Sequence, residues 1–463
     1  MGERDAASFR DPSGHVHHHD GRILRTITSR AVPGYERVRD TGLLRRWIDA
    51  GWVVETREVP VSDLPLDGPP PRYLLEHARI PFISYPYEWP FAALKAAALL
   101  HLDLQLDALA QNVQLSDASA YNVQFDGSRP VFIDVLSFRP YTEGDYWLGH
   151  RQFSEQFLNP LLLRALAGLA PNAWYCGNLE GITSIELDAL LPVMRRMSWN
   201  VFSHVTLPAR LAARRGRAAK TDGPQRPRRP LPRAAYAGML TQLRGWIARL
   251  EPRGHRKTTW SDYEHTHTYA NGEHAAKHEA VKRFVAETRP PMLWDFGCNT
   301  GEYAQLALEH GAHAVIGFEA DHGALDRAYA RATGTKLRFL PLYLDGANPS
   351  PDQGWRQQER RGLQARGPAD ALLALAFIHH LAIGRNVPLD EIAAWLTTLA
   401  PRGLIEFVQK DDPMVQLMLA SREDIFVGYT EEAFAMALGR HARIVGTTTV
   451  SGTGRRLFTY DRS

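Results

Sequence analysis

One segment, residues 291–311, constrains the fold of this chain more than any other feature. It reads PMLWDFGCNTGEYAQLALEHG, and its apolar residues predict a strand that ends at Asp295 and, after a turn, an amphipathic helix. Glycine at positions 297 and 301 permits a close approach of a ligand that a Cβ atom would prevent. The N-terminus of the following helix attracts electron-rich groups. The segment therefore predicts a strand–turn–helix unit that binds a ligand.

The region after this segment continues to alternate predicted strands and helices, which is typical of a doubly wound parallel sheet. The predicted parallel strands are Met292–Phe296, Ala314–Phe318, Leu337–Leu342, Ala369–Ala374 and Gly403–Phe407. Two later apolar segments, ARIVGTTTV and RRLFTYD, flank the turn residues 451–454 and predict an antiparallel hairpin. The C-terminal part is therefore predicted to be α/β, with a mostly parallel seven-stranded sheet.

Acidic residues follow three consecutive predicted strands. Asp295 ends the first strand, Glu319 follows 24 residues later at the end of the second, and Asp345 follows the third. In open α/β sheets, ligands bind at the carboxyl ends of the strands. A carboxylate at Glu319 can accept both hydroxyl protons of a ribose, and Asp345 is placed to accept a hydrogen bond from an adenine amino group. These residues predict a site for a nucleoside-containing cofactor.

The turn DFGCNTG resembles the first motif of the class I S-adenosylmethionine-dependent methyltransferases, Asp-x-Gly-x-Gly-x-Gly. Asn299 replaces the middle glycine, but asparagine tolerates left-handed backbone. The segments DGANPSPDQGW, LALAFIHHLAI, IEFVQKDDPMV and EDIFVGYT resemble a subgroup of rhizobial host-specificity nodulation methyltransferase-like proteins, and this likeness spans most of residues 21–463. The resemblance implies a Rossmann-like class I fold and S-adenosylmethionine as the cofactor, with its methionine carboxylate at the helix N-terminus. The implied cofactor-binding residues are Asp295, Gly297, Asn299, Gly301, Glu319 and Asp345.

Other functions are weighed against a methyltransferase. A nicotinamide enzyme shares the glycine-rich first turn, but DFGCNTG lacks the GxGxxG spacing, and no GxxxxGK[ST] phosphate loop occurs. A non-catalytic scaffold that binds the cofactor is a further alternative. The methyl acceptor could be a small molecule, a glycan or a protein, and the sequence does not indicate the oligomeric state.

Two adjacent histidines are the candidate catalytic residues. His379 and His380 follow the fourth predicted strand, at the sheet edge where acceptors bind in this family. Either imidazole could act as a general base with a near-neutral pKa. The alternative is that one of them packs against or caps the next helix. Glu406, at the end of the fifth strand, is a candidate to shape the acceptor pocket.

A histidine-rich segment precedes the first strand. It contains His265, His267, His274 and His278, and the last two share one face of a predicted helix, as zinc-binding histidines can. Ala275 occupies the glutamate position of HExxH, however, and no cysteine lies nearby. We therefore predict no metal site here, and interpret the segment as a cover for the cofactor.

The length of 463 residues predicts two domains and a connector. We expect a disordered tail over residues 1–20, an α+β domain over 21–207, a basic Pro/Arg-rich linker over 208–235 and the methyltransferase domain over 236–463. The basic run needs no nucleic-acid partner when it serves as a solvated linker.

The N-terminal domain contains a motif of its own. LSDASAYNVQFDGSRPVFIDVLSF places Asp117, Asn122 and Asp134 at spacings that resemble the catalytic and magnesium-binding loops of kinases. No glycine-rich strand loop or nucleotide-pairing lysine accompanies them. A phosphotransferase, a kinase-like remnant or pseudokinase, an acceptor-binding domain and a plain β-hairpin are the alternatives.

The number of cysteines and the hydropathy of the sequence indicate in which cellular compartment we expect the protein. Cys176 and Cys298 are the only two cysteines, so no disulfide framework is expected. The polar N-terminus lacks a signal-peptide core, and charged residues interrupt the most apolar stretch, residues 91–110. We expect a cytoplasmic protein with no membrane span.

Overall fold

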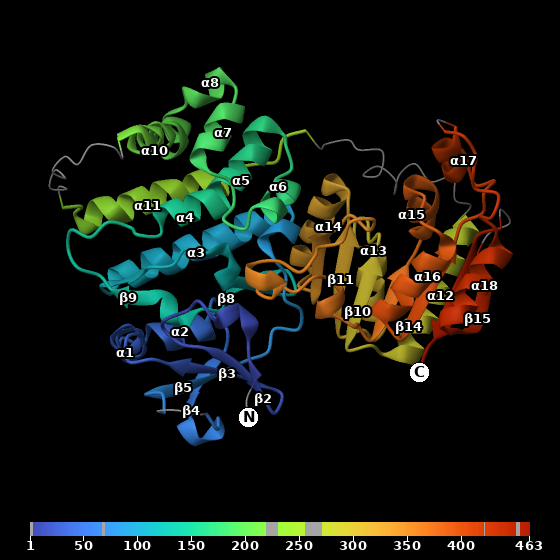
Figure 1. Cartoon of the computed structure of the whole chain (residues 1–463), viewed down its shortest axis with the longest axis horizontal. Coiled ribbons are helices and arrows are strands. Elements are labelled where there is room, and N and C mark those ends of the chain that lie inside the picture. The colour runs from blue at the N-terminus through green and yellow to red at the C-terminus, as the bar shows by residue number, and fades with distance from the viewer. Residues whose placement is uncertain (1–2, 67–69, 219–229, 255–270, 421, 451–453) are drawn as a thin grey trace. The chain divides into compact units, whose positions relative to one another are not determined.

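The computed structural model describes residues 3–66, 70–218, 230–254, 271–420, 422–450 and 454–463 (Figure 1). The chain divides into two compact units. The first unit comprises Met1–Gly254 and Gly354–Glu359, and the second comprises His255–Gln353 and Arg360–Ser463. Within the described residues, no helix is both long enough and apolar enough to cross a membrane.

The second unit is built on a seven-stranded sheet in the order β12-β11-β10-β13-β14-β16-β15. Its strands are β10 (Met292–Phe296), β11 (Ala314–Glu319), β12 (Phe339–Tyr343), β13 (Ala371–Ala374), β14 (Arg402–Phe407), β15 (Arg443–Thr449) and β16 (Arg456–Asp461). The first five strands pair in parallel, whereas β16 runs antiparallel to both of its neighbours. The prediction of five parallel strands followed by an antiparallel hairpin is confirmed, and the strand bounds agree to within two residues.

Helices cover both faces of this sheet, as a doubly wound fold requires. They are α12 (Asn271–Thr288), α13 (Glu302–Glu309), α14 (His322–Thr335), α15 (Ile378–Arg385), α16 (Leu389–Leu399), α17 (Pro413–Leu419) and α18 (Glu431–His441). Side chains of α12, α13 and α14 pack with Leu293 of β10 in one core cluster. Phe296, on the same strand but on its other face, instead contacts Trp395 of α16. Because strand side chains alternate between faces, β10 contributes to two cores.

The first unit combines an antiparallel sheet with a largely helical part. Its sheet order is β1-β2-β3-β5-β4, from β1 (Glu3–Arg4), β2 (Val16–His19), β3 (Arg22–Ile27), β4 (Thr56–Val59) and β5 (Tyr73–His77). Two small antiparallel pairs follow, β6 (Val113–Leu115) with β9 (Phe138–Pro140) and β7 (Val123–Asp126) with β8 (Arg129–Phe132). The helices are α1 (Val32–Asp40), α2 (Leu43–Asp49), α3 (Phe91–Ala110), α4 (His150–Phe153), α5 (Asn159–Leu162), α6 (Asn172–Gly177), α7 (Ser184–Leu190), α8 (Val193–Arg196), α9 (Trp199–Val201), α10 (Leu207–Ala218) and α11 (Arg233–Ala248).

The expected disordered tail is wrong, because residues 3–20 have a defined structure that includes the strands β1 and β2 of the first sheet. Strand β2 pairs with β3 around Asp20 and Gly21, whose φ angles are +48° and +73°. Two left-handed residues are what a type I′ hairpin turn requires, and Asp-Gly is a preferred pair for it. The sequence therefore carries a hairpin signal at residues 20 and 21, which a disordered tail would not need.

The predicted linker and domain boundary also need correction. Residues 219–229 lie outside the described residues, but α10 extends to Ala218. Helix α11 then packs on α3 of the first unit, where the side-chain amide of Gln105 donates to the hydroxyl of Tyr236 at 2.7 Å. The first unit therefore runs to Gly254 rather than ending at residue 207.

Candidate functional site

The turn between β10 and α13 is held in place by the end of β11. Gly297, Asn299 and Gly301 all have positive φ, at +74°, +49° and +84°. The backbone N–H groups of Gly297 and Cys298 donate to the carbonyl oxygen of Phe318, at 2.8 and 3.1 Å. Asn299 therefore adopts the left-handed conformation expected for it.

The two glycines of this turn are required for different reasons. A Cβ atom on Gly301 would lie 2.4 Å from the ring of Phe339, and Gly301 does not line the cavity described below. Gly297 does line it. The expectation that both glycines let a ligand approach thus needs correction at Gly301, which is needed for packing and for its backbone conformation.

A cavity of about 560 Å³ opens at the carboxyl ends of the parallel strands in the second unit. Its lining includes seven residues predicted from the sequence: Asp295, Gly297, Asn299, Glu319, Asp345, His379 and His380. The size lies within the range of roughly 300–1,000 Å³ that is typical of small-molecule sites. The structure thus brings together residues that are separated by up to 85 positions in the chain.

Asp295 is the buried carboxylate of this cavity. Its side chain is 2% exposed, and its Oδ2 atom has no hydrogen-bond partner among the described residues. Burial, together with the nearby charge of Glu319, raises the pKa of Asp295 to about 7, although the charge of Lys277 opposes this shift. A buried carboxylate oxygen without a partner is costly, so the site favours a ligand that donates a hydrogen bond to it.

Glu319 is fixed by the backbone around it. Its carboxylate accepts hydrogen bonds from the N–H groups of Asn299, Ala320 and Asp321 at 3.0, 2.7 and 2.8 Å. Burial raises the pKa of Glu319, while these three bonds oppose that shift. Oε2 receives only one of them, so it keeps capacity to accept from a ligand.

Asp345 lies beyond β12 at the same edge. Its Oδ1 atom accepts from the N–H of Ala347 at 3.0 Å, and its Oδ2 atom lies 3.2 Å from Nη2 of Arg385. Arg385 also lines the cavity, although no motif in the sequence identified it. This ion pair links Asp345 to α15.

His379 and His380 lie in the first turn of α15 (Ile378–Arg385), and their ring centroids are 4.1 Å apart. Burial lowers the pKa of His380 to about 4 and that of His379 well below its usual value. The charges of His380, Arg455 and Lys277 lower the pKa of His379 further. The near-neutral pKa expected from the sequence is therefore wrong, because the low-dielectric surroundings disfavour the imidazolium form.

A buried ion-pair network beside the cavity was not predicted. Nζ of Lys277 lies 2.6 Å from Oε2 of Glu406, which is fully buried, and Arg455 pairs with both Glu406 and Asp412 at 3.3 and 2.8 Å. Burial raises the pKa of Glu406, but the charges of Lys277 and Arg455 outweigh it and lower the pKa overall. Glu406 does not line the cavity, whereas its partner Lys277 does, so the expectation that Glu406 itself lines a pocket is wrong.

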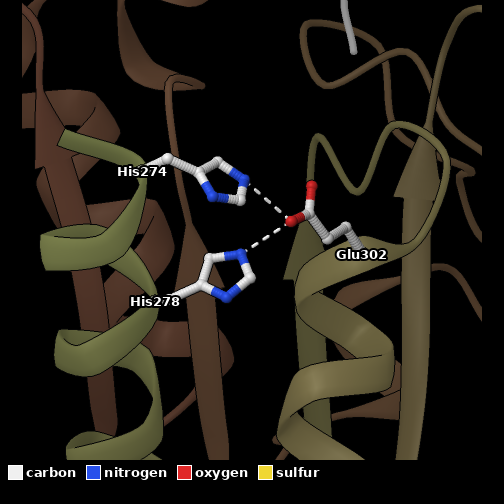
Figure 2. Close-up of side chains that lie close together, drawn as sticks. All are labelled: His274, His278 and Glu302. Atoms are coloured by element: carbon white, nitrogen blue, oxygen red, sulfur yellow. Dashed lines mark hydrogen bonds and ion pairs between the residues drawn. The ribbon is translucent and has the colours of Figure 1, made fainter. Parts of the chain in front are cut away.

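The histidine-rich segment divides between described and undescribed residues. His265 and His267 lie outside the described residues, whereas His274 and His278 lie on α12 and both contact Glu302 (Figure 2). His274 and Glu302 line the cavity. The side chains of His274, His278 and Glu302 form the one group in the described part of the chain whose donor atoms are arranged to hold a metal ion.

In the first unit, the three polar residues whose spacing resembles that of kinase loops, Asp117, Asn122 and Asp134, lie near one another. Ser137 links two of them: its hydroxyl donates to Oδ2 of Asp134 at 2.5 Å and accepts from Nδ2 of Asn122 at 3.3 Å. Burial, and then the charge of Asp134, raises the pKa of Asp117. Arg25 of β3 pairs with Asp134 at 2.9 Å. Asp117, Asn122 and Asp134 therefore form one polar cluster between β6 and β9.

The chain is 49% identical over 461 residues to the nodulation protein NoeA of Rhizobium meliloti (strain 1021). The match covers 99% of this chain and 96% of that protein. The resemblance to rhizobial nodulation proteins is thus confirmed. No protein-family profile matches the chain.

Comparison with solved structures finds methyltransferases at low similarity. Magnesium protoporphyrin IX methyltransferase (ChlM) from Synechocystis PCC 6803, with bound SAH, is 19% identical at a TM-score of 0.30, covering 43% of this chain and 91% of that one. The bifunctional kinase-methyltransferase WbdD is 14% identical at a TM-score of 0.29, covering 48% and 46%. TM-scores of this size establish neither a fold nor a function for this chain.

Proposed function

We propose that this chain, which belongs to the family of the nodulation protein NoeA, is an S-adenosylmethionine-dependent methyltransferase. The observation that carries the proposal is the cavity in the second unit, where acidic side chains from the ends of three consecutive parallel strands surround a glycine turn and a helix N-terminus. The antiparallel β16 further separates this sheet from the all-parallel order of dinucleotide-binding folds.

The charge of the cavity supports a cationic cofactor. Six carboxylate side chains line it, Glu273, Asp295, Glu302, Glu319, Asp321 and Asp345, against the two cations Lys277 and Arg385. S-adenosylmethionine carries an ammonium and a sulfonium group, whereas a nicotinamide dinucleotide brings a doubly negative pyrophosphate. Electrostatic complementarity therefore favours the methyl donor.

Each binding residue is matched to one part of this cofactor. The unpartnered Oδ2 atom of Asp295 accepts from the ammonium group, and the first N–H groups of α13 face the methionine carboxylate. Glu319 accepts from the ribose hydroxyls, and Asp345 accepts from the adenine amino group. Gly297 and Asn299, both with positive φ, shape the turn between β10 and α13 against which the cofactor lies.

The chemistry requires alignment more than proton transfer. When bound, the cofactor supplies an electrophilic methyl group on a sulfonium. The chain's part is to hold the acceptor in line and to exclude water. His379 and His380, with lowered pKa values, are neutral at pH 7, so they suit an acceptor that needs a hydrogen-bond partner rather than a strong base. The acceptor can be a small molecule, a glycan or a protein.

Calorimetry with S-adenosylmethionine tests the proposal. We expect Asp295→Ala and Glu319→Ala to weaken binding by tenfold or more, because each removes a charge-assisted hydrogen bond worth about 1.5–3 kcal/mol. Glu309→Gln, at an exposed position on α13, is the matched control and should bind as the parent does. Unchanged affinity in both alanine variants would remove these residues from the site. Binding without turnover on any acceptor would favour a scaffold.

A second candidate function rests on the polar cluster of the first unit. The convergence of Asp117, Asn122 and Asp134 supports magnesium-dependent phosphotransfer in that unit. The ion pair between Arg25 and Asp134 occupies one oxygen that a magnesium ion would need. A phosphotransferase must therefore release Asp134 from Arg25, whereas a pseudokinase would keep this pair.

A further inference from the structure

The side chains of His274, His278 and Glu302 meet at the wall of the cavity, and none of these side chains is assigned to the methyl donor. The two histidines lie one helical turn apart on α12, and Glu302 is the first residue of α13. The Nε2 atoms of His274 and His278 lie 2.8 and 2.6 Å from Oε1 of Glu302. Figure 2 shows both rings turned toward the same carboxylate. Three donor atoms from two helices therefore converge on one point.

A simple hydrogen-bonded tie between the helices would need only one imidazole. Here both rings contact a single oxygen, and their centroids lie 4.2 Å apart. Two imidazole nitrogens beside a carboxylate form the donor set of three-residue zinc sites, in which two histidines and a glutamate hold the ion. The pairing of the histidines thus points to a shared cation rather than to two separate hydrogen bonds.

We propose that His274, His278 and Glu302 bind a divalent transition-metal ion such as Zn²⁺. Imidazole ligands favour transition metals, whereas Mg²⁺ and Ca²⁺ prefer sites built of oxygen atoms alone. Three protein ligands leave at least one coordination position open. Because His274 and Glu302 line the cavity, an open position is reachable from inside it.

The helices already hold the ligands near the required spacing. Around a tetrahedral zinc ion with bonds of about 2.0–2.1 Å, ligand atoms lie about 3.4 Å apart. The donor atoms here all lie within 4.8 Å of one another, so side-chain rotation alone can make room for the ion. Val281 of α12 and Ala304 of α13 pack in the same core cluster, and the ring of Tyr303 lies 5.3 Å from that of His278. This packing fixes the two backbones.

The sequence alone argued against a metal because HExxH is absent. The structure supplies the carboxylate from the next helix, 24 residues after His278, where no local motif shows it. The open position gives the ion access to a heteroatom of the methyl acceptor, a consequence that rests on the proposed function. The metal site itself does not depend on it.

Titration of the metal-free full chain with ZnCl₂, in the absence of S-adenosylmethionine, tests the site. We expect one Zn²⁺ per chain and, with Co²⁺, visible absorption bands typical of imidazole and carboxylate ligation. Glu302→Gln keeps an oxygen that accepts from imidazole but removes the anionic ligand. It should therefore leave the melting temperature of the metal-free chain unchanged. It should weaken Zn²⁺ binding by more than about tenfold, since substitution of residues that only hydrogen-bond to a metal ligand already costs about tenfold or more in metal affinity.

The control addresses a group of histidines far from this site in the sequence. His18 and His19 lie on β2 of the first unit, and the double variant His18→Ala/His19→Ala should bind Zn²⁺ as the parent does. His278→Ala should lose the site along with Glu302→Gln. Parental binding in both of these variants, or loss of binding in the β2 variant, would overturn the proposal. Because the titration contains no cofactor, its result is independent of whether S-adenosylmethionine binds.

Discussion

At the residue scale, the chemistry of the cavity depends on burial as much as on residue type. Asp295 and His379 are both 2% exposed, and burial disfavours the charged form of each. The carboxyl pKa therefore rises while the imidazole pKa falls. Near neutral pH this brings Asp295 close to its titration point and leaves His379 uncharged. A cationic ligand would restore the carboxylate form of Asp295.

This shift predicts how stability depends on pH. The folded-state pKa of Asp295, about 7, lies above its ordinary value of 3.8, so the folded state binds more protons than the unfolded state between these values. The free energy of unfolding should therefore fall as pH rises from about 4 to about 7, by up to roughly 1.4 kcal/mol per pH unit from this group. Asp295→Asn should remove this contribution and be the more stable protein at pH 8.

Urea unfolding of both proteins at pH values from 4 to 8 provides the measurement. The difference between parent and Asp295→Asn should grow with pH across this window, whereas Glu309→Gln should follow the parent throughout. A difference that stays constant with pH would show that burial does not shift this carboxyl group.

At the element scale, charged side chains connect elements that no local pattern relates. Lys277 lies on α12, Glu406 on β14, Asp412 caps α17, and Arg455 immediately precedes β16. The ion pairs among them are buried, so each charge has lost its hydration and depends on its partners. The network therefore ties α12, which carries two of the proposed metal ligands, to β14 and to the start of β16.

The variant Arg455→Met tests how much this network contributes to the free energy of unfolding. Removing the guanidinium leaves Asp412, which is 4% exposed, without its charged partner. We expect a loss of about 3–5 kcal/mol in the free energy of unfolding, as for other broken buried pairs. The exposed pair of Arg440 and Asp390 offers a matched control, and Arg440→Met should cost less than about 1 kcal/mol. Equal losses in the two variants would contradict the role assigned to Arg455.

At the scale of the whole molecule, the chain consists of two units, each with its own buried residues and its own candidate site. The second unit holds the cavity, and the first holds the cluster around Asp134. A ligand that binds only the folded form of one unit stabilises that unit by mass action. The two sites can therefore be tested separately in the intact chain.

Calorimetric unfolding should show two transitions that respond to different ligands. S-adenosylmethionine at about 100 times its Kd should raise one transition by roughly 5–10 °C, because about 2.7 kcal/mol of binding energy is added to a unit of this size. Asp295→Ala should abolish that shift. If the first unit is a phosphotransferase, MgATP should raise the other transition, and Asp134→Asn should abolish that response. A shift of both transitions by S-adenosylmethionine would contradict separate sites.

The sequence by itself determined the α/β architecture of the second unit and seven of the residues that line its cavity. Apolar periodicity and the spacing of Asp295, Glu319 and Asp345 are local features, and parallel strands necessarily bring their carboxyl ends to one edge. The Asp20–Gly21 turn is equally local, because the two residue types themselves favour the left-handed backbone that it requires.

Only the tertiary structure decided which distant groups meet and how burial changes them. The contact of His278 with Glu302 and that of Lys277 with Glu406 join elements whose sequences carry no sign of each other. The lowered pKa of His380 likewise follows from its buried surroundings. Hydrogen bonds, ion pairs and desolvation depend on three-dimensional neighbours, whereas hydrophobic periodicity depends only on the neighbours along the chain.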